Sequence, residues 1–147
     1  MTTKAYLKLI LFSSFLVSLL FLQACKKEAG QGGVASISGY VFVDTVFNNK
    51  NNAILGTNQY MPNINVYLCY GNDSVPSDNA KSSYNGQFTF NYLQKGKYTV
   101  FVSSDNMALG VFPVTNFKPF TIIKKEITIS DRKGTVDAGT FHINYAY

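Results

Sequence analysis

Hydrophobic and polar residues alternate most clearly over residues 84–102, in the middle of the chain. Asn85-Gly86 predicts a type I′ hairpin turn, because both central residues of that turn need a positive φ angle. Beyond it, hydrophobic side chains occupy every second position, which is the period of a strand with one buried face. These positions are Phe88 and Phe90 before a second turn at Gly96, and Tyr98, Val100 and Val102 after it. The segment predicts two strands that contribute to a core.

The same alternation recurs on both sides of this segment. Residues 36–44 and 63–70 each place three aliphatic side chains on one face; these are Ile37, Val41, Val43, Ile64, Val66 and Leu68. Shorter patterns predict strands at 79–83, 121–129 and 135–145, the last two joined by a turn at Ser130–Gly134. Gly39 marks a place where another backbone comes close. About seven short strands predict an all-β fold, a seven-stranded prealbumin-like (Ig-like) β-sandwich.

Two stretches do not alternate and are predicted to be long loops, Thr45–Pro62 and Ser104–Pro119. Connections of this length are often binding elements. The second one carries apolar side chains where polar turn residues are expected, so it is the candidate binding loop, with Met107, Leu109, Phe112 and Phe117 as its candidate contact residues. The alternative is that Phe112 and Phe117 cover an open end of the core.

Composition agrees with this pattern. The 147 residues leave room for one domain, and 12 Phe and 10 Tyr with no Trp favour strands over helices. The formal charge is +5, and it falls to +3 if Lys4 and Lys8 are removed with a leader. The basic residues are scattered, which argues against a nucleic-acid-binding groove.

The N-terminus has the pattern of a targeting segment, Met1–Ala24. Lys4 and Lys8 lie just before a 14-residue apolar run, Leu9–Leu22. As a helix this run would reach only about 21 Å, short of a bilayer core of about 30 Å, so it predicts a cleaved signal peptide. The run ends in Leu22-Gln23-Ala24-Cys25, which resembles the lipobox of bacterial lipoproteins. That resemblance implies an acylated Cys25 as the mature N-terminus; an ordinary secretory signal is the alternative.

The segment after Cys25 is predicted to be a flexible tether. Residues 25–35 contain three glycines and no periodicity, so we expect the sandwich domain to occupy residues 36–147. By resemblance to Gram-negative lipoproteins, Lys26 after the cysteine favours the outer membrane, with the face undetermined. If Cys25 carries lipid, Cys69 in its apolar strand is a small buried hydrophobe rather than a disulfide partner.

Several strands together resemble the carboxypeptidase regulatory-like domain. The residues that carry the resemblance are Ile37-x-Gly39-x-Val41, Ile64-x-Val66-x-Leu68, Gly86-x-Phe88-x-Phe90-x-x-Leu93-x-x-Gly96-x-Tyr98-x-Val100 and Asp137-x-Gly139. The resemblance covers roughly residues 36–145 and implies a transthyretin-like sandwich, related to Cna B-type repeats. Tyr98 resembles a tyrosine corner, in which a buried ring places its hydroxyl on upstream backbone. Gly86, Phe88, Phe90, Leu93, Gly96 and Tyr98 are therefore interpreted as a structural motif.

The sequence offers little for catalysis or for metal binding. The one histidine, His142, has no serine or acid at a recognisable catalytic spacing, so we expect no enzyme activity and no cofactor. Cys and His are too few for a metal site. Asp44 with the Asn-rich loop, or Asp73 with Asp78, could supply oxygen ligands for calcium, but neither has the dense spacing of a Ca²⁺ loop.

Together these features predict a lipid-anchored outer-membrane sandwich that acts as a non-catalytic adhesion, binding or scaffold module for a protein partner. One alternative is a glycan-binding module, which would need coplanar exposed aromatic side chains beside Asn or Asp. Another is a small accessory or inhibitor subunit of a cell-envelope enzyme.

Overall fold

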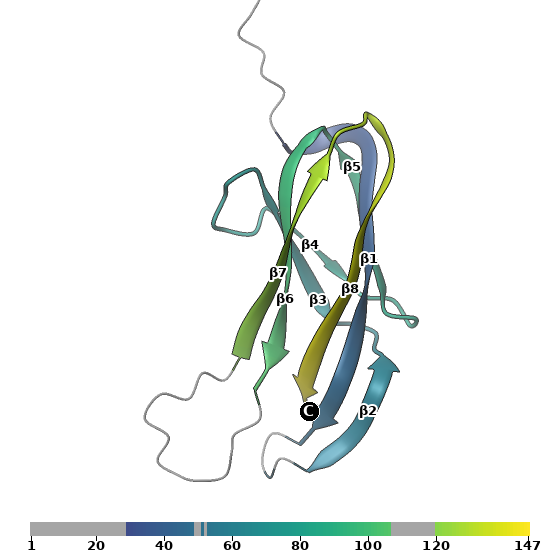
Figure 1. Cartoon of the computed structure of the whole chain (residues 1–147), viewed down its shortest axis with the longest axis vertical. Coiled ribbons are helices and arrows are strands. Elements are labelled where there is room, and N and C mark those ends of the chain that lie inside the picture. The colour runs from purple at the N-terminus through teal and green to yellow at the C-terminus, as the bar shows by residue number, and fades with distance from the viewer. Residues whose placement is uncertain (1–28, 49–50, 52, 107–119) are drawn as a thin grey trace, which may run out of the picture.

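The computed structural model describes residues 29–48, 51, 53–106 and 120–147, and all regular elements within these ranges are strands. Two sheets pack face to face as a sandwich (Figure 1). The first sheet contains β1 (Gln31–Phe47), β2 (Ile54–Tyr60), β5 (Gln87–Leu93) and β8 (Lys133–Ala146). The second contains β3 (Asn65–Tyr70), β4 (Asp78–Lys81), β6 (Gly96–Asp105) and β7 (Phe120–Ile129). The described ranges hold no helix long and apolar enough to cross a bilayer.

β1 is the organising strand of the first sheet. One of its edges pairs with β8 in parallel from Val34 to Phe47. Its other edge pairs antiparallel with β5 along its first half and with β2 along its second. The second sheet is antiparallel throughout, in the order β4-β3-β6-β7. The chain crosses between sheets after β2, β4, β5 and β7, so each sheet is built from distant parts of the sequence.

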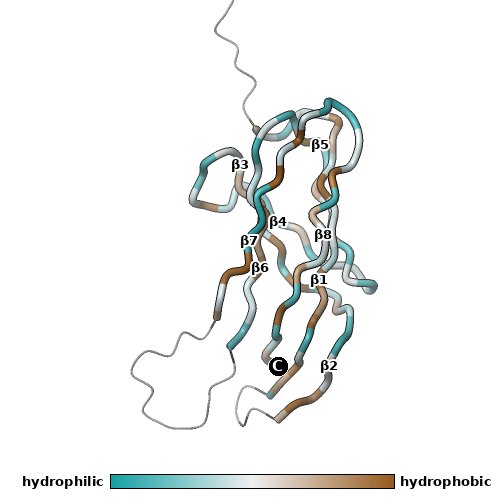
Figure 2. The backbone as a smooth tube through the Cα atoms, in the orientation of Figure 1, coloured by the Kyte–Doolittle hydropathy of each residue, from teal (hydrophilic) through white to brown (hydrophobic). Residues whose placement is uncertain are grey.

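The core lies between the two sheets and is made by the inward residues that alternation predicts. Ile37, Val41 and Val43 are fully buried, as are Val66 and Leu68 on β3. Aromatic rings fill the centre, with Phe88 edge-to-face against both Phe90 and Phe141. Each large side chain removed from water contributes about 1.5–3 kcal/mol. β7 follows this alternation of inward and outward residues less closely, because it is hydrophobic at its start and hydrophilic midway (Figure 2).

The sandwich and the all-β class are confirmed, but the described residues form eight strands rather than the seven predicted. The additional strand is β2, which lies inside the predicted loop Thr45–Pro62. β2 has no buried face, because all of its residues are exposed or half-exposed. It is held by backbone pairing to β1, between Phe42↔Tyr60 and Phe47↔Ile54. A strand without an inward face leaves no hydrophobic period in the sequence, so the loop interpretation was wrong over this stretch.

The predicted tether is also shorter than expected, because β1 begins at Gln31. Gly33 in this stretch permits close backbone packing rather than a flexible linker. A Cβ on Gly33 would overlap the backbone carbonyl group of Leu93. Gln31 and Ala35 both register against Leu93, so the strand bulges at the intervening residues. Only a residue without a side chain fits at Gly33.

The turn at Asn85-Gly86 is present, but it is not a type I′ hairpin. Only Gly86 has a positive φ (76°), and its amide donates to the Ser83 carbonyl at 2.9 Å. The turn joins β4 in one sheet to β5 in the other, so it does not pair two neighbouring strands. Gly86 is required for a second reason, since a Cβ there would lie 2.5 Å from the Val41 carbonyl oxygen.

Tyr98 forms the predicted tyrosine corner. Its ring is 1% exposed, and its hydroxyl donates to the Gln94 carbonyl at 2.7 Å. The same hydroxyl accepts the Gly30 amide proton at 3.0 Å. Burial raises the pKa of Tyr98, and these backbone hydrogen bonds act in the opposite direction. The corner therefore fastens the beginning of the described chain to the β5–β6 turn.

The Asp137-x-Gly139 motif makes a bulge in β8. The Asp137 carboxylate accepts the Gly139 amide proton at 2.7 Å, and Gly139 has a φ of 68°. The bulge faces Gly39 on β1, where a Cβ would lie 2.6 Å from the Gly139 carbonyl oxygen. This is the close backbone approach that the sequence predicts at Gly39.

Candidate functional site

The outer face of the first sheet carries three aromatic side chains, Tyr40, Phe42 and Tyr60, called here the aromatic row. Val41 and Val43 point into the core, so alternation directs Tyr40 and Phe42 outward. Tyr60 on β2 lies opposite Phe42 in the strand register. Its ring centroid is 5.2 Å from that of Phe42 and 5.8 Å from that of Tyr40, at interplanar angles of 84° and 61°. The rings are therefore not coplanar, unlike the aromatic platform expected of a glycan site from the sequence. Tyr60 is 49% exposed and Tyr40 37%.

A polar pair lies at one end of the aromatic row. The parallel pairing of β1 with β8 places His142 beside Phe42, with ring centroids 5.2 Å apart. Asp44 is two residues further along β1, and its Oδ1 lies 2.8 Å from His142 Nδ1. An ionised carboxylate can only accept, so Nδ1 donates, and Nε2 of a neutral ring is left as an acceptor. Both side chains are exposed.

This arrangement is suited to binding a ligand that has both an apolar face and hydroxyl groups. The three rings offer apolar surface, and the Tyr40 and Tyr60 hydroxyls add donors and acceptors. The Asp44 carboxylate and the His142 imidazole can each accept a hydroxyl proton. An acid–base pair also needs a nucleophile to act as a catalytic triad. Within the described residues, His142 hydrogen-bonds to Asp44 and to no Ser, Thr or Cys side chain.

Metal ligands do not gather anywhere in the described ranges. No group of three or more His, Cys, Asp or Glu side chains converges there. Asp44, weighed as a calcium ligand from the sequence, instead bonds to His142. Asp73 lies in a polar turn, where it borders hollows of about 370 and 460 Å³ together with Lys97.

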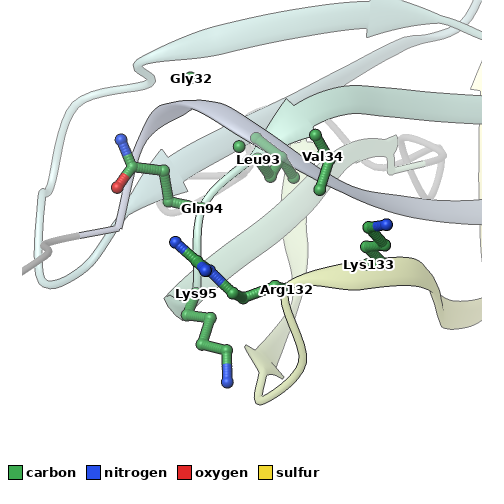
Figure 3. A pocket seen from close by; sticks show the side chains of 8 residues that line it. Gly32, Val34, Leu93, Gln94, Lys95, Arg132 and Lys133 are labelled. Atoms are coloured by element: carbon green, nitrogen blue, oxygen red, sulfur yellow. The ribbon is translucent and has the colours of Figure 1, made fainter.

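A separate hollow of about 300 Å³ lies where β1 begins, beside the β5–β6 and β7–β8 turns (Figure 3). It is called here the basic pocket, because its charged side chains are Lys95, Arg132 and Lys133. The rest of its wall is formed by Val34, Leu93, Gln94 and the two glycines of β1, Gly32 and Gly33. The basic pocket is remote from the aromatic row, since Val34, the pocket residue nearest to the row along β1, is six residues or about 20 Å of strand from Tyr40.

The side chains of the predicted structural motif are internal. Phe88, Phe90, Leu93 and Tyr98 are at most 2% exposed, Gly86 lies in a turn, and Gly96 begins β6. None of them belongs to the aromatic row. Cys69 is a buried free thiol; burial raises its pKa, and the nearby Asp73 carboxylate raises it further. Such a thiol is a poor nucleophile.

The candidate binding loop residues Met107, Leu109, Phe112 and Phe117 lie outside the described residues, as does Cys25. Their roles stay predictions. At the edge of that segment, Phe120 and Ile122 on β7 are 51% and 46% exposed.

Sequence reasoning did not identify the aromatic row as a site. One signal was available in the sequence. If Val41 and Val43 point into the core, alternation directs Tyr40 and Phe42 to the outer face of the sheet. Tyr60 gave no signal, since it lay in a segment interpreted as loop. His142 was considered alone, although the fold brings it to Asp44 from 98 residues away.

A family model supplies an independent comparison. The model of the IRG7 N-terminal galactose binding domain matches residues 31–117, more than half of the chain. The chain belongs to this family. The match starts where β1 starts, and it includes the whole aromatic row together with Asp44. His142 lies beyond it, so within the polar pair only Asp44 falls in the matched part of the galactose-binding domain.

Other comparisons add less. A solved structure from Pseudomonas aeruginosa, described as a "putative carbohydrate binding protein", is 16% identical to this chain. It aligns over 76% of this chain and 91% of its own length with a TM-score of 0.42, a similarity that carries no inference about function. No curated protein matches the sequence at a significant level. The comparisons do not show a carboxypeptidase regulatory-like family, so that resemblance stays a prediction.

Proposed function

We propose that this chain is a non-catalytic glycan-binding module that binds a galactose residue on the aromatic row. The observation that carries the proposal is the aromatic row, in which Tyr40 and Tyr60 are exposed and Phe42 is half-buried, beside the Asp44–His142 pair. The galactose-binding family to which the chain belongs supports the same ligand class. This proposal takes the glycan-binding alternative over the protein-partner interpretation of the sequence.

Galactose can make two kinds of contact with this surface, apolar contacts with the rings and hydrogen bonds with the polar pair. One face of a galactose ring presents mainly C–H groups, which can lie against an aromatic ring and exclude water from both. Its hydroxyls need partners when they leave water, because an unpaired polar group is costly to bury. Asp44 and His142 stand at the end of the row where they can accept these hydroxyl protons.

The expected affinity is weak for a single sugar. A ligand of about twelve non-hydrogen atoms at about 0.3 kcal/mol per atom reaches a Kd on the order of millimolar. Isothermal titration or ligand-detected NMR with galactose and galactose-terminated oligosaccharides measures it. Tyr60→Ala removes the most exposed ring of the row, and we expect binding to weaken by about fivefold or more, as for a hot-spot aromatic.

Tyr84→Ala is the matched control, because Tyr84 is 86% exposed on the β4–β5 turn and outside the row. Binding should be unchanged in that variant. Melting temperatures of both variants separate loss of the site from loss of the fold. Galactose binding that persists undiminished in a folded Tyr60→Ala variant would refute the assignment.

The proposal includes a lipid anchor and an outer-membrane location. The anchor is supported by the run from Lys4 to Leu22-Gln23-Ala24-Cys25 in the sequence, and the outer-membrane location by Lys26 after the cysteine. Mass spectrometry of the mature protein should find diacylglycerol on Cys25, with residues 1–24 absent. An unmodified N-terminus at another residue would contradict the anchor.

Protein binding remains a second candidate, because Phe120 and Ile122 are exposed at the start of β7, which is an edge strand. They adjoin the candidate binding loop in the sequence. Phe112→Ser together with Phe117→Ser tests it by affinity capture from an outer-membrane extract. Lost capture at an unchanged melting temperature would support a binding loop, whereas a large drop in melting temperature would mean that the loop covers the core.

A further inference from the structure

The basic pocket gathers three cations from two turns of the sandwich. Lys95 comes from the β5–β6 turn, Arg132 from the β7–β8 turn and Lys133 from the start of β8. Figure 3 shows the Arg132 side chain reaching toward Gln94 and Lys95, while Lys133 lies nearer to Val34. Across the described ranges, no carboxylate forms an ion pair with any of the three, the adjacent Asp131 included. Their positive charge is therefore not neutralised within the fold.

The pocket adjoins the place where the described chain begins. The backbone amide of Gln94 donates to the Gly30 carbonyl at 2.8 Å. Cys25 is five residues before Gly30, so a fully extended chain separates them by at most about 18 Å. Lys26 and Lys27 belong to the same short span. The C-terminus lies at the opposite end of the sandwich (Figure 1).

We propose that the basic pocket binds the phosphate of an anionic lipid headgroup in the membrane that holds Cys25. The inference rests on the lipid anchor of the proposed function. A guanidinium matches phosphate oxygens in a bidentate geometry, and two ammonium groups add charge around it. Basic residues next to an anchor are attracted to anionic lipid surfaces. The pocket would hold the sandwich in one orientation, with β2 directed away from the bilayer.

Amine footprinting on the full-length mature lipoprotein tests this. The protein is reconstituted in phosphatidylcholine vesicles, without or with about 30% phosphatidylglycerol as the anionic lipid. An amine-reactive reagent and mass spectrometry then give the labelling rate of each lysine. We expect phosphatidylglycerol to slow the labelling of Lys95 and Lys133 by about threefold or more, and about 0.5 M salt to reverse the effect. Lys81 and Lys124, both exposed on the second sheet, are internal controls. Arg132→Gln should remove most of the protection.

Three results would overturn the inference. Equal labelling of Lys95 and Lys133 in both kinds of vesicle would show that the headgroup is not bound. Equal slowing of Lys81 and Lys124 would show a general surface effect. Protection of the pocket lysines by millimolar inorganic phosphate or glucuronate in pure phosphatidylcholine would assign the pocket to a soluble anion or an acidic sugar. The intact mass is read in the same sample: an unmodified Cys25 overturns both the anchor and this inference, whereas a lipidated protein with unprotected lysines overturns the inference alone.

Discussion

Removing one oxygen atom from the tyrosine corner is the most direct test of how the fold is held together. Tyr98→Phe keeps the buried ring and deletes the hydroxyl. That hydroxyl donates to the Gln94 carbonyl at 2.7 Å and accepts from the Gly30 amide at 3.0 Å. The variant therefore weakens the attachment of the chain at Gly30 to the β5–β6 turn without opening a large cavity, and the Gln94 amide still donates to the Gly30 carbonyl.

The magnitude can be worked out from the two hydrogen bonds. Each contributes a net of about 0.5–1.5 kcal/mol to stability, and a partner left unsatisfied raises the cost. Gly30 and Gln94 are half-buried, so water can replace part of what is lost. We expect Tyr98→Phe to lower the free energy of unfolding by about 1–3 kcal/mol, which is about 4–12 °C in melting temperature for a domain of this size.

Two matched tyrosines serve as controls in the same denaturant and thermal unfolding assays. Tyr84→Phe deletes an exposed hydroxyl and should change nothing measurable. Tyr70→Phe deletes a buried hydroxyl that makes no well-formed hydrogen bond, although the Gln31 side chain is near enough to influence it. Its loss should change stability by less than about 1 kcal/mol in either direction. If Tyr98→Phe were as stable as Tyr84→Phe, the corner would not hold the chain start, and the reasoning would be refuted.

Three further predictions concern the core. Phe90→Ala should cost about 3–5 kcal/mol in chemical unfolding, whereas Thr89→Ala on the outer face should stay within about 0.5 kcal/mol; an unchanged Phe90→Ala melt would contradict the register. Gly33→Ala should destabilise by about 1–3 kcal/mol, because its Cβ meets the Leu93 carbonyl oxygen. Burial raises the pKa values of Cys69 and Tyr98 above 9.0 and 10.0. The unfolded chain therefore loses these protons at a lower pH than the folded chain does. The stabilising contribution of the two groups is fully present below pH 9 and should be lost as the pH rises through their folded-state pKa values. Cys69 should resist thiol reagents until the chain is denatured.

The strands that sequence reasoning located are those with one face in the core. Val66, Leu68, Phe88 and Phe90 appear at every second position, and their burial follows that period. β2 was missed because a strand exposed on both sides has no period to detect. The turn at Gly86 was located but given the wrong type, since the pattern Asn-Gly does not report that the two flanking strands belong to different sheets.

The candidate site was harder to predict, because it depends on strand pairing that is not local. The Asp44–His142 pair exists only because β8 returns to lie parallel to β1. Tyr60 joins the aromatic row only because β2 pairs with the second half of β1. Alternation fixes which face a side chain occupies, whereas register between distant strands fixes which side chains meet.

The position of the aromatic row on paired strands gives one more consequence for the proposed function. β1 is paired along both edges, so Tyr40 and Phe42 are held by the register and lose little freedom when a ligand binds. A site of this kind should not depend on the segment Ser104–Pro119. We therefore expect the Phe112→Ser, Phe117→Ser double variant, wherever it remains folded, to bind galactose with unchanged affinity in the titration that Tyr60→Ala impairs. A folded double variant that loses galactose binding would place the sugar site on that segment and would refute the assignment to the outer face of the first sheet.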